Sequence, residues 1–331
     1  GRPSDTKSYD IRYLTNAWNR VRGKRYFLTQ RYNLGFTREL EEEDEEGNPK
    51  EMFVPVSSII HTIDYEDNRR RFIADNTALM DSSYIVDDNG QRFPRIYGLG
   101  ATLNDQTSSW NLKNTIGLSL REGFQDWVKF GLTAFVRLEK RRFKLEPRIE
   151  GLDYGEYGRG PYFSVDNIDL KNLPTAKLYD EFSTYVGAEL SKRQGSILTY
   201  NARGELCMVG SDVGEFRVTG DLQTRFKLFN KDAVIKADAY IKNVTPAFYM
   251  RHNHSRYYWW DNPNFNMTQQ IYAGGEVYLE SSKTTLKAGV ESIQNYIYFN
   301  KQGFPVQHSS NLQVVSARIK QDFRFRAFGW E

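Results

Sequence analysis

Apolar and polar side chains alternate along much of the chain, most regularly in its second half. Even positions from 216 to 228 are apolar or glycine apart from Thr224, whereas odd positions from 215 to 227 are charged or polar. Successive side chains of an extended strand point to opposite faces, so this period of two predicts a strand with one apolar and one ionic face. A turn at 229–232 leads into a second alternating run at 233–242, which predicts an antiparallel hairpin.

The same period recurs elsewhere, in the segments 110–121, 129–139, 182–190, 198–208, 271–279, 286–290 and 315–326. Two earlier segments, 26–40 and 53–65, are also expected to be strands. Helical spacing would scatter the charges around an axis, which makes an α-helical fold a poor interpretation. Several runs reach the roughly 9–11 residues that a tilted membrane-crossing strand needs, whereas strands of soluble proteins average about five or six. We predict an all-β fold with about eleven or twelve strands.

The links between the predicted strands alternate in length. Short links lie near 122–127, 191–196, 229–232 and 281–284, and longer ones at 67–105, 147–180 and 250–267. Outer-membrane barrels have short periplasmic turns and long outer loops. The chain is therefore predicted to be a single domain, residues 1–331, folded as a transmembrane antiparallel up-and-down β-barrel with short periplasmic turns and long extracellular loops.

An acidic link at 39–46 does not fit this alternation well. By position it falls on the periplasmic side, but it is long for a turn, and a solvated flap is the alternative. Residues 41–46 are all acidic, with Asp44 among glutamates, and they lack the spaced Asp and Gly residues of a calcium loop. Solvation therefore accounts for it better than calcium binding does.

The composition supports a membrane barrel without requiring it. Aromatic residues make up 15% of the 331 residues, yet the mean hydropathy is −0.65. A barrel wetted on one face, with Tyr and Trp at the membrane interfaces, combines these two properties. A large soluble β-sandwich rich in tyrosine is the alternative. A net charge of +3 without basic clustering argues against a nucleic-acid partner, and the single cysteine, Cys207, excludes an internal disulfide.

Charged faces of membrane strands are expected to turn inward, because Lys or Arg facing lipid at mid-membrane costs about 2–4 kcal/mol. The predicted lumen-lining residues are Arg137, Glu139, Arg203, Glu205, Arg217, Asp221, Arg225, Lys227, Lys236, Asp238, Arg318 and Arg324. Charges of both signs favour passage of polar solutes of modest size over strong ion selectivity.

Other candidate sites each have a simpler explanation. His252 and His254 would share one face of a strand and could hold a metal, but a polar loop tip explains them better, and we predict no metal or cofactor. Ser57 and His61 are four strand residues, ~13 Å, apart and too distant for direct catalytic contact. We therefore expect no enzymatic activity.

An aromatic loop, Tyr257, Tyr258, Trp259 and Trp260, is predicted to be extracellular. Such rings could stack on a sugar, although they more often form an aromatic girdle or fold a loop.

Three blocks carry a family resemblance, namely 24–35, 54–62 followed by Tyr65, and 259–262. They are similar to the putative porin family of Bacteroidota outer membranes. The resemblance implies a bacterial outer-membrane β-barrel with passive-channel activity, in contact with the lipid bilayer and lipopolysaccharide. Members of that family are longer, so N-terminal strands are expected to be missing here. The end of the chain departs from the usual barrel pattern, because Glu331 follows the aromatic Trp330.

Three functions remain open at this point. The first is passive diffusion of small polar solutes through a charged lumen. The second is a structural barrel with a plugged lumen, acting as a subunit or anchor among outer-membrane protein partners or as a homo-oligomer. The third is a soluble extracellular β protein that binds glycans.

Overall fold

The structure is a computed structural model, and it describes most of the predicted strands. The described residues are 17–43, 49–74, 84–86, 92–94, 103–123, 129–145, 177–193, 195, 197–228, 230–254, 259–301, 303–325 and 328–330.

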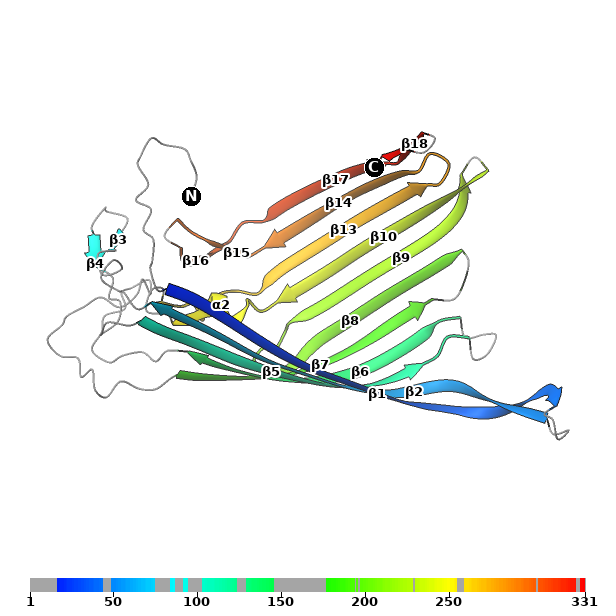
Figure 1. Cartoon of the computed structure of the whole chain (residues 1–331), viewed down its shortest axis with the longest axis horizontal. Coiled ribbons are helices and arrows are strands. Elements are labelled where there is room, and N and C mark those ends of the chain that lie inside the picture. Colours follow the sequence, from blue (N-terminus) through cyan, green and yellow to red (C-terminus); the bar gives the residue numbers. More distant parts are fainter. Residues whose placement is uncertain are drawn as a thin grey trace.

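One antiparallel sheet of eleven strands dominates the molecule (Figure 1). In sheet order, the strands are β1 (Ala17–Glu43), β2 (Pro49–Ala74), β5 (Leu103–Leu120), β6 (Gly131–Leu145), β7 (Lys177–Lys192), β8 (Leu198–Gly210), β9 (Phe216–Leu228), β10 (Lys231–Val244), β13 (Thr268–Leu279), β14 (Thr284–Gln294) and β17 (Leu312–Gln321). Each strand pairs with the next along the chain, apart from short hairpins in the links. This confirms the predicted all-β, antiparallel, up-and-down arrangement.

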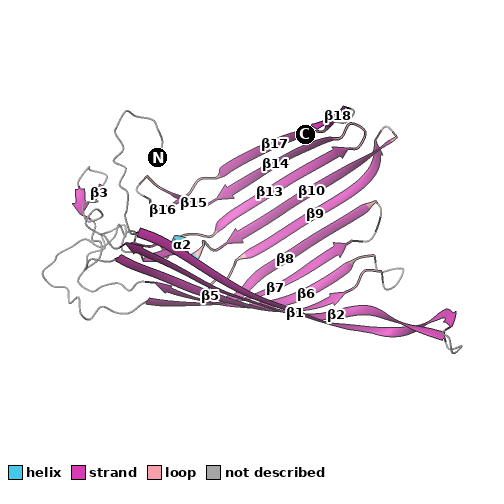
Figure 2. Ribbon diagram, in the orientation of Figure 1, coloured by secondary structure: helices cyan, strands magenta, loops and turns pink. Residues whose placement is uncertain are grey.

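Short elements occupy the links and the stretch after β17, and strands make up nearly all of the described structure (Figure 2). They are the hairpins β3 (Tyr84–Val86) with β4 (Arg92–Pro94), β11 (His252–His254) with β12 (Trp259–Asp261), β15 (Tyr296–Phe299) with β16 (Pro305–His308), and β18 (Phe323–Phe325) with β19 (Phe328–Trp330), and the single-turn helix α2 (Phe248–Arg251). None of the helices in the described residues is long and apolar enough to cross a membrane.

An apolar row crosses nine neighbouring strands on one face of the sheet. Directly paired residues of an antiparallel sheet lie on the same face, and the register sets nine of them side by side. They are Leu120, Leu132, Leu190, Ala202, Gly220, Ala239, Ala273, Val290 and Val315. Every member of the row is apolar or glycine, so the alternation seen in single strands becomes a continuous band.

The burial of this sheet is the inverse of that in a soluble protein. On the apolar face of β6, Leu132, Val136 and Leu138 are 41–45% exposed, whereas Glu139 on the opposite face is 7% exposed. Ser183 and Asp64, on the same polar face as Glu139, are also buried. Within the described part of the chain, no second sheet covers the apolar band. This arrangement argues against the core of a soluble sandwich.

The sheet is open in the described residues, because β1 and β17 form its two edges. The predicted closure into a barrel, and its insertion into a membrane, therefore remain predictions. The order and direction of the strands place the connections from β5 to β6, β7 to β8, β9 to β10 and β13 to β14 at one end of the sheet, and the turn between β8 and β9 at the other (Figure 1). The four predicted short links are all found at the first end.

The first hairpin differs from the sequence prediction. The expected strands 26–40 and 53–65 are too short, since β1 and β2 run for 27 and 26 residues. Most of the predicted acidic link at 39–46 belongs to β1, and only residues 44–48, outside the described residues, separate the strands. The predicted link at 67–105 is also too wide, because β2 continues to Ala74. The hairpin extends past the short-link end because β2 pairs with β5 only from Ser57 onward (Figure 1).

Gly210 provides the first testable prediction. It ends β8 with φ +111, and a Cβ there would collide with the carbonyl oxygen of Phe182 on β7. Gly210→Ala is therefore expected to reduce the free energy of unfolding by about 1–3 kcal/mol. The control is Gly220→Ala, whose Cβ would lie 3.9 Å from its nearest neighbour, the Asn201 carbonyl oxygen. It should change stability by about 0.5 kcal/mol or less. Urea unfolding of the refolded protein measures both, and equal losses would contradict the prediction.

Candidate functional site

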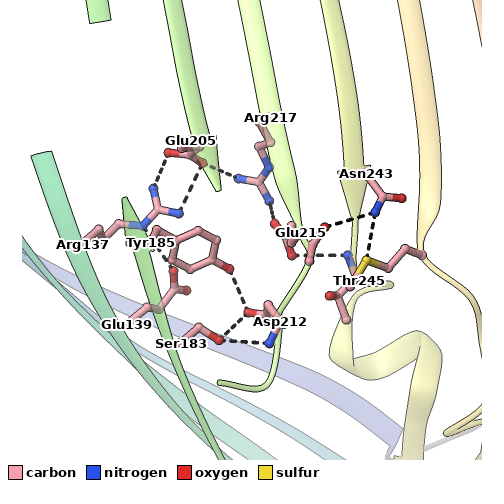
Figure 3. A network of polar contacts seen from close by, with 12 residues as sticks. Arg137, Glu139, Ser183, Tyr185, Glu205, Asp212, Glu215, Arg217, Asn243 and Thr245 are labelled. Carbon is pink, nitrogen blue, oxygen red and sulfur yellow. Dashed lines mark hydrogen bonds and ion pairs between the residues drawn. The ribbon is translucent and has the colours of Figure 1, made fainter. Parts of the chain in front are cut away.

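The polar face of β6 to β9 carries a connected network of ion pairs (Figure 3). Odd-numbered residues of each strand face this side because the strands alternate and their register matches. Arg137 and Glu139 come from β6, Tyr185 from β7, Glu205 from β8 and Arg217 from β9.

Arg137 and Glu205 form the centre of the network. Arg137 Nη1 lies 2.9 Å from Glu205 Oε2 and its Nη2 lies 3.3 Å from Oε1, which makes a two-point contact between guanidinium and carboxylate. The Arg137 guanidinium also lies 4.1 Å from the centre of the Tyr185 ring. Glu205 further contacts Arg217 at 3.5 Å and Arg203 at 3.6 Å. Paired and hydrogen-bonded charges of this kind are stronger than isolated surface pairs.

Asp212, in the turn between β8 and β9, is fully buried against this network. Its carboxylate accepts hydrogen bonds from Ser183 Oγ and Tyr185 OH, both at 2.9 Å, and forms an ion pair with Arg141. Its backbone N–H donates to Ser183 Oγ at 3.2 Å. A buried carboxylate is tolerated only with such partners, so these contacts fix the turn to β6 and β7.

Arg217 extends the network to the next connection along the chain. Its Nη2 lies 2.5 Å from Oε1 of the buried Glu215, whose Oε2 accepts from the Thr245 backbone N–H at 3.3 Å. Asn243 then bonds to the Gly214 carbonyl at 3.3 Å. The end of β10 is thereby linked to the turn that carries Asp212.

The connection between β10 and β13, residues 245–267, folds back over the polar face. The Phe248 ring of α2 stacks on Phe143 of β6 at 3.7 Å between centroids and meets Tyr179 of β7 edge-on at 5.3 Å. Arg251 Nη2 reaches Glu181 Oε1 on β7 at 2.7 Å. Glu181 and Tyr179 lie beyond Ser183, the residue of β7 that pairs with the last residue of β8, so this connection reaches β6 and β7 past the ends of β8 and β9.

The two histidines of β11 meet an aspartate rather than an open ligand site. His252 Nδ1 and His254 Nε2 lie 2.6 Å and 2.9 Å from Oδ1 of Asp261 on β12. Burial alone would raise the pKa of Asp261, but the hydrogen bonds from the two imidazoles outweigh it and hold the pKa well below its usual range. Among the residues that the structure describes, no group of three or more His, Cys, Asp or Glu is arranged to hold a metal ion.

Trp260 of the predicted aromatic loop is 8% exposed and holds neighbouring links together. Its Nε1–H donates to the Tyr249 carbonyl at 3.1 Å, and its ring lies 6.2 Å from those of Phe299 and Phe304. Tyr257 and Tyr258, and the side chain of Trp259, lie outside the described residues. The one described ring of this loop therefore folds the loop rather than offering a surface for sugar stacking.

The register places eleven of the twelve predicted lumen residues on one face, shared with Arg137. The side chain of the twelfth, Arg324, lies outside the described residues. That this face lines a closed lumen remains a prediction. His61 lies on the apolar face and bonds to Asn114 Oδ1 at 2.9 Å.

Sequence reasoning missed several members of the network, namely Arg141, Glu181, Tyr185, Asp212, Glu215 and Arg251. Continuing the alternation of β6 two residues beyond Glu139 reaches Arg141. The alternation of β7 places Glu181 and Tyr185 on the same polar face. Glu215 starts the alternating run at 215–227 but was left out of the predicted lumen-lining residues, whereas Asp212 and Arg251 lie in links, where no periodicity indicates which way a side chain points.

The buried Asp212 gives the second prediction. Asp212→Ala leaves Arg141, Ser183 and Tyr185 without their common acceptor, and is expected to cost about 3 kcal/mol of unfolding free energy. Asp221→Ala, at an exposed position on the same face, should cost about 0.5 kcal/mol or less. Urea unfolding of the two variants provides the comparison. Similar, small losses would show that the network contributes little to stability.

Comparison with known proteins identifies the family. The family model described as "Putative porin" matches residues 3–331. No curated protein and no solved structure matches the chain. An eleven-stranded antiparallel sheet with one apolar and one ionic face is the architecture that this family description leads one to expect. Because the match covers nearly the whole chain, the protein belongs to the putative porin family.

Proposed function

We propose that this chain forms the wall of an outer-membrane β-barrel that lets small polar solutes diffuse passively through a charged lumen. The observation that carries the proposal is the inverted burial of the sheet, with exposed Leu132, Val136 and Leu138 on one face and buried Glu139 on the other. Water would strongly disfavour an apolar band this wide, whereas acyl chains would accept it. The family match supports the same location.

Closure of the sheet is part of the proposal. The edges β1 and β17 present rows of backbone groups to the surroundings, and in hydrocarbon each unpaired group costs several kcal/mol. Pairing of these edges with each other, or with further strands of the same barrel, removes that cost. The strands of 10 residues or more are long enough to cross a bilayer when tilted.

The interior features favour a narrow conduit. Arginines and carboxylates of the network are closely balanced, so the wall would hold water in a transverse field without strong selection for one sign of charge. The connection at 245–267, held by Phe248 and Arg251, would project into the lumen and reduce its cross-section. This favours solutes of modest size.

The same features support a second candidate, a structural barrel with a blocked lumen that serves a larger envelope complex. Arg137 and Glu205 are nearly buried by their own network, with side chains 15% and 8% exposed. If further links fill the remaining space, the barrel would conduct nothing. Glycan binding has less support, because the Trp260 ring is engaged within the fold.

Conductance separates the two candidates and gives the third prediction. The full chain reconstituted in planar bilayers should show discrete conductance steps. Phe248→Ala combined with Arg251→Gln removes the stacking and the ion pair that hold the connection to the wall, and should increase the step size. Glu280→Gln, in the exposed turn between β13 and β14, should leave it unchanged. A flat current from both wild type and double variant would end the conduit proposal and leave the structural barrel.

Membrane insertion itself gives the fourth prediction. Leu222, 41% exposed, and Gln223 are neighbours on β9 that face opposite sides of the sheet. In lipid vesicles, Leu222→Arg is expected to lower the unfolding free energy by about 2 kcal/mol or more, since it places a charge in lipid. Gln223→Arg should change it by about 0.5 kcal/mol or less. Equal effects, or full solubility of the folded wild type without detergent, would contradict a lipid-facing band.

A further inference from the structure

A pocket of about 470 Å³ is lined both by the sheet and by the links that fold over it. We call it the aromatic pocket. On the sheet it is lined by residues that include Val21 of β1 and Arg70 of β2, and on the links by residues that include Tyr249 and Met250 of α2 and Phe299 of β15. Its volume is within the range of roughly 300–1,000 Å³ that is usual for small-molecule sites.

The register turns the sheet residues of the aromatic pocket to the face that carries the ion-pair network. Val21 pairs with Arg70 across the β1–β2 ladder, and Arg70 pairs with Thr107 of β5. Eight residues further along these strands, a second row on the same face consists of Thr29, Thr62, Thr115 and Arg137. The aromatic pocket therefore lies on the polar side of the sheet and not on the apolar band.

Arg70 provides a positive charge in this pocket. Its side chain is exposed, and its Nε donates to the neutral Oδ1 of Asn19 at 3.1 Å. None of the described residues that line the pocket is acidic, and no carboxylate of the described residues forms an ion pair with Arg70. A guanidinium has five N–H donors, and the bond to Asn19 uses one of them. A carboxylate in the pocket could accept two more from the same side chain.

Two aromatic side chains provide the apolar part of the lining. Tyr249 is 39% exposed and Phe299 is 51% exposed. Trp260, itself largely buried, holds both in place, because its Nε1–H donates to the Tyr249 carbonyl and its ring lies 6.2 Å from that of Phe299. Tyr249 also meets Phe143 of β6 edge-on at 5.8 Å. The rings are thus positioned before a ligand arrives, which reduces the entropy lost on binding.

We propose that the aromatic pocket binds an aromatic carboxylate, with its ring against Tyr249 and Phe299 and its carboxylate on Arg70. Aromatic side chains favour a flat ring in offset or edge-on packing, and a guanidinium matches the two oxygens of a carboxylate. One such arginine suits a singly charged group better than a phosphate group, which carries about two charges. This inference deepens the proposed function and rests on it in one respect, since it makes these anions a class of solute that the conduit takes up.

Calorimetric titration of the refolded full chain in non-ionic detergent micelles tests the proposal, with empty micelles as the blank. Phenylacetate should bind at least about tenfold more tightly than phenylacetamide, which has the ring without the charge, or acetate, which has the charge without the ring. Glucuronate, a carboxylate on a non-aromatic ring, should bind as weakly as acetate. If phenylacetamide or glucuronate bound as tightly as phenylacetate, the proposal would be overturned.

A charge variant with a matched control locates the carboxylate. Arg70→Gln should lower the affinity for phenylacetate about tenfold, the loss expected for charge-assisted hydrogen bonds. Arg31→Gln removes an exposed arginine from the same face of β1, ten residues from Val21 and roughly 33 Å along the strand. This control should bind phenylacetate as the wild type does. Equal losses in the two variants would reduce the effect to net charge and overturn the proposal.

A ring variant locates the aromatic group of the ligand. Phe299→Leu keeps an apolar side chain but loses the ring, and should lower the affinity for phenylacetate about threefold. Tyr298→Leu is the control, because Tyr298 is the neighbour of Phe299 on β15, is 41% exposed and does not line the pocket. It should leave the affinity unchanged. Equal effects of the two variants would contradict the placement of the ring.

Urea unfolding separates a loss of binding from a loss of folding. Saturating phenylacetate should raise the unfolding midpoint of the wild type, Arg31→Gln and Tyr298→Leu, because the ligand binds the folded state. At the same ligand concentration the midpoint of Arg70→Gln should rise much less, whatever its value without ligand. No rise in the wild type would overturn the proposal. Neither assay measures current, so a failure here is distinguishable from a failure of the proposed conduit, which conductance tests.

Discussion

Cross-strand register keeps the apolar row level across nine neighbouring strands and sets the predicted lumen-lining charges on the opposite face. A slip of one residue between any two strands would turn a whole strand over and place its charges in the apolar band. The row from Leu120 to Val315 therefore depends on every intervening ladder being correct. The ion pairs between β6 and β8, and the bonds of Asp212 to β6 and β7, reinforce that register from the polar side.

The period of two was sufficient to predict the strands, their antiparallel order and the side on which most charges lie. This succeeds because strand geometry links each residue to a face without reference to distant contacts. It fails at strand ends. The first hairpin is underestimated because its outer part pairs only within the hairpin, and the side chains of residues 49–52 are exposed, so no buried face imposes a pattern on them.

The links were beyond the reach of the sequence for a different reason. Nothing local indicates that Phe248 stacks on Phe143, more than a hundred residues earlier, or that Asp212 turns toward Arg141. Such contacts depend on the curvature of the whole sheet, which brings β6 and β7 opposite the end of β10. The sequence therefore predicted several of the network residues that lie in the strands, where side chains alternate. It did not predict those in the links, such as Asp212 and Arg251.

The connection that runs from β10 to β6 and β7 joins two separated strands of the curved sheet, as a chord joins two points of a circle. Its length is fixed by stacked rings at one end and by the strand it leaves at the other. For a curved surface, a chord of fixed length over a fixed number of strands determines the radius. The bore of any closed form of this sheet would thus be set, at this end, by one short segment of chain as much as by the number of strands around it.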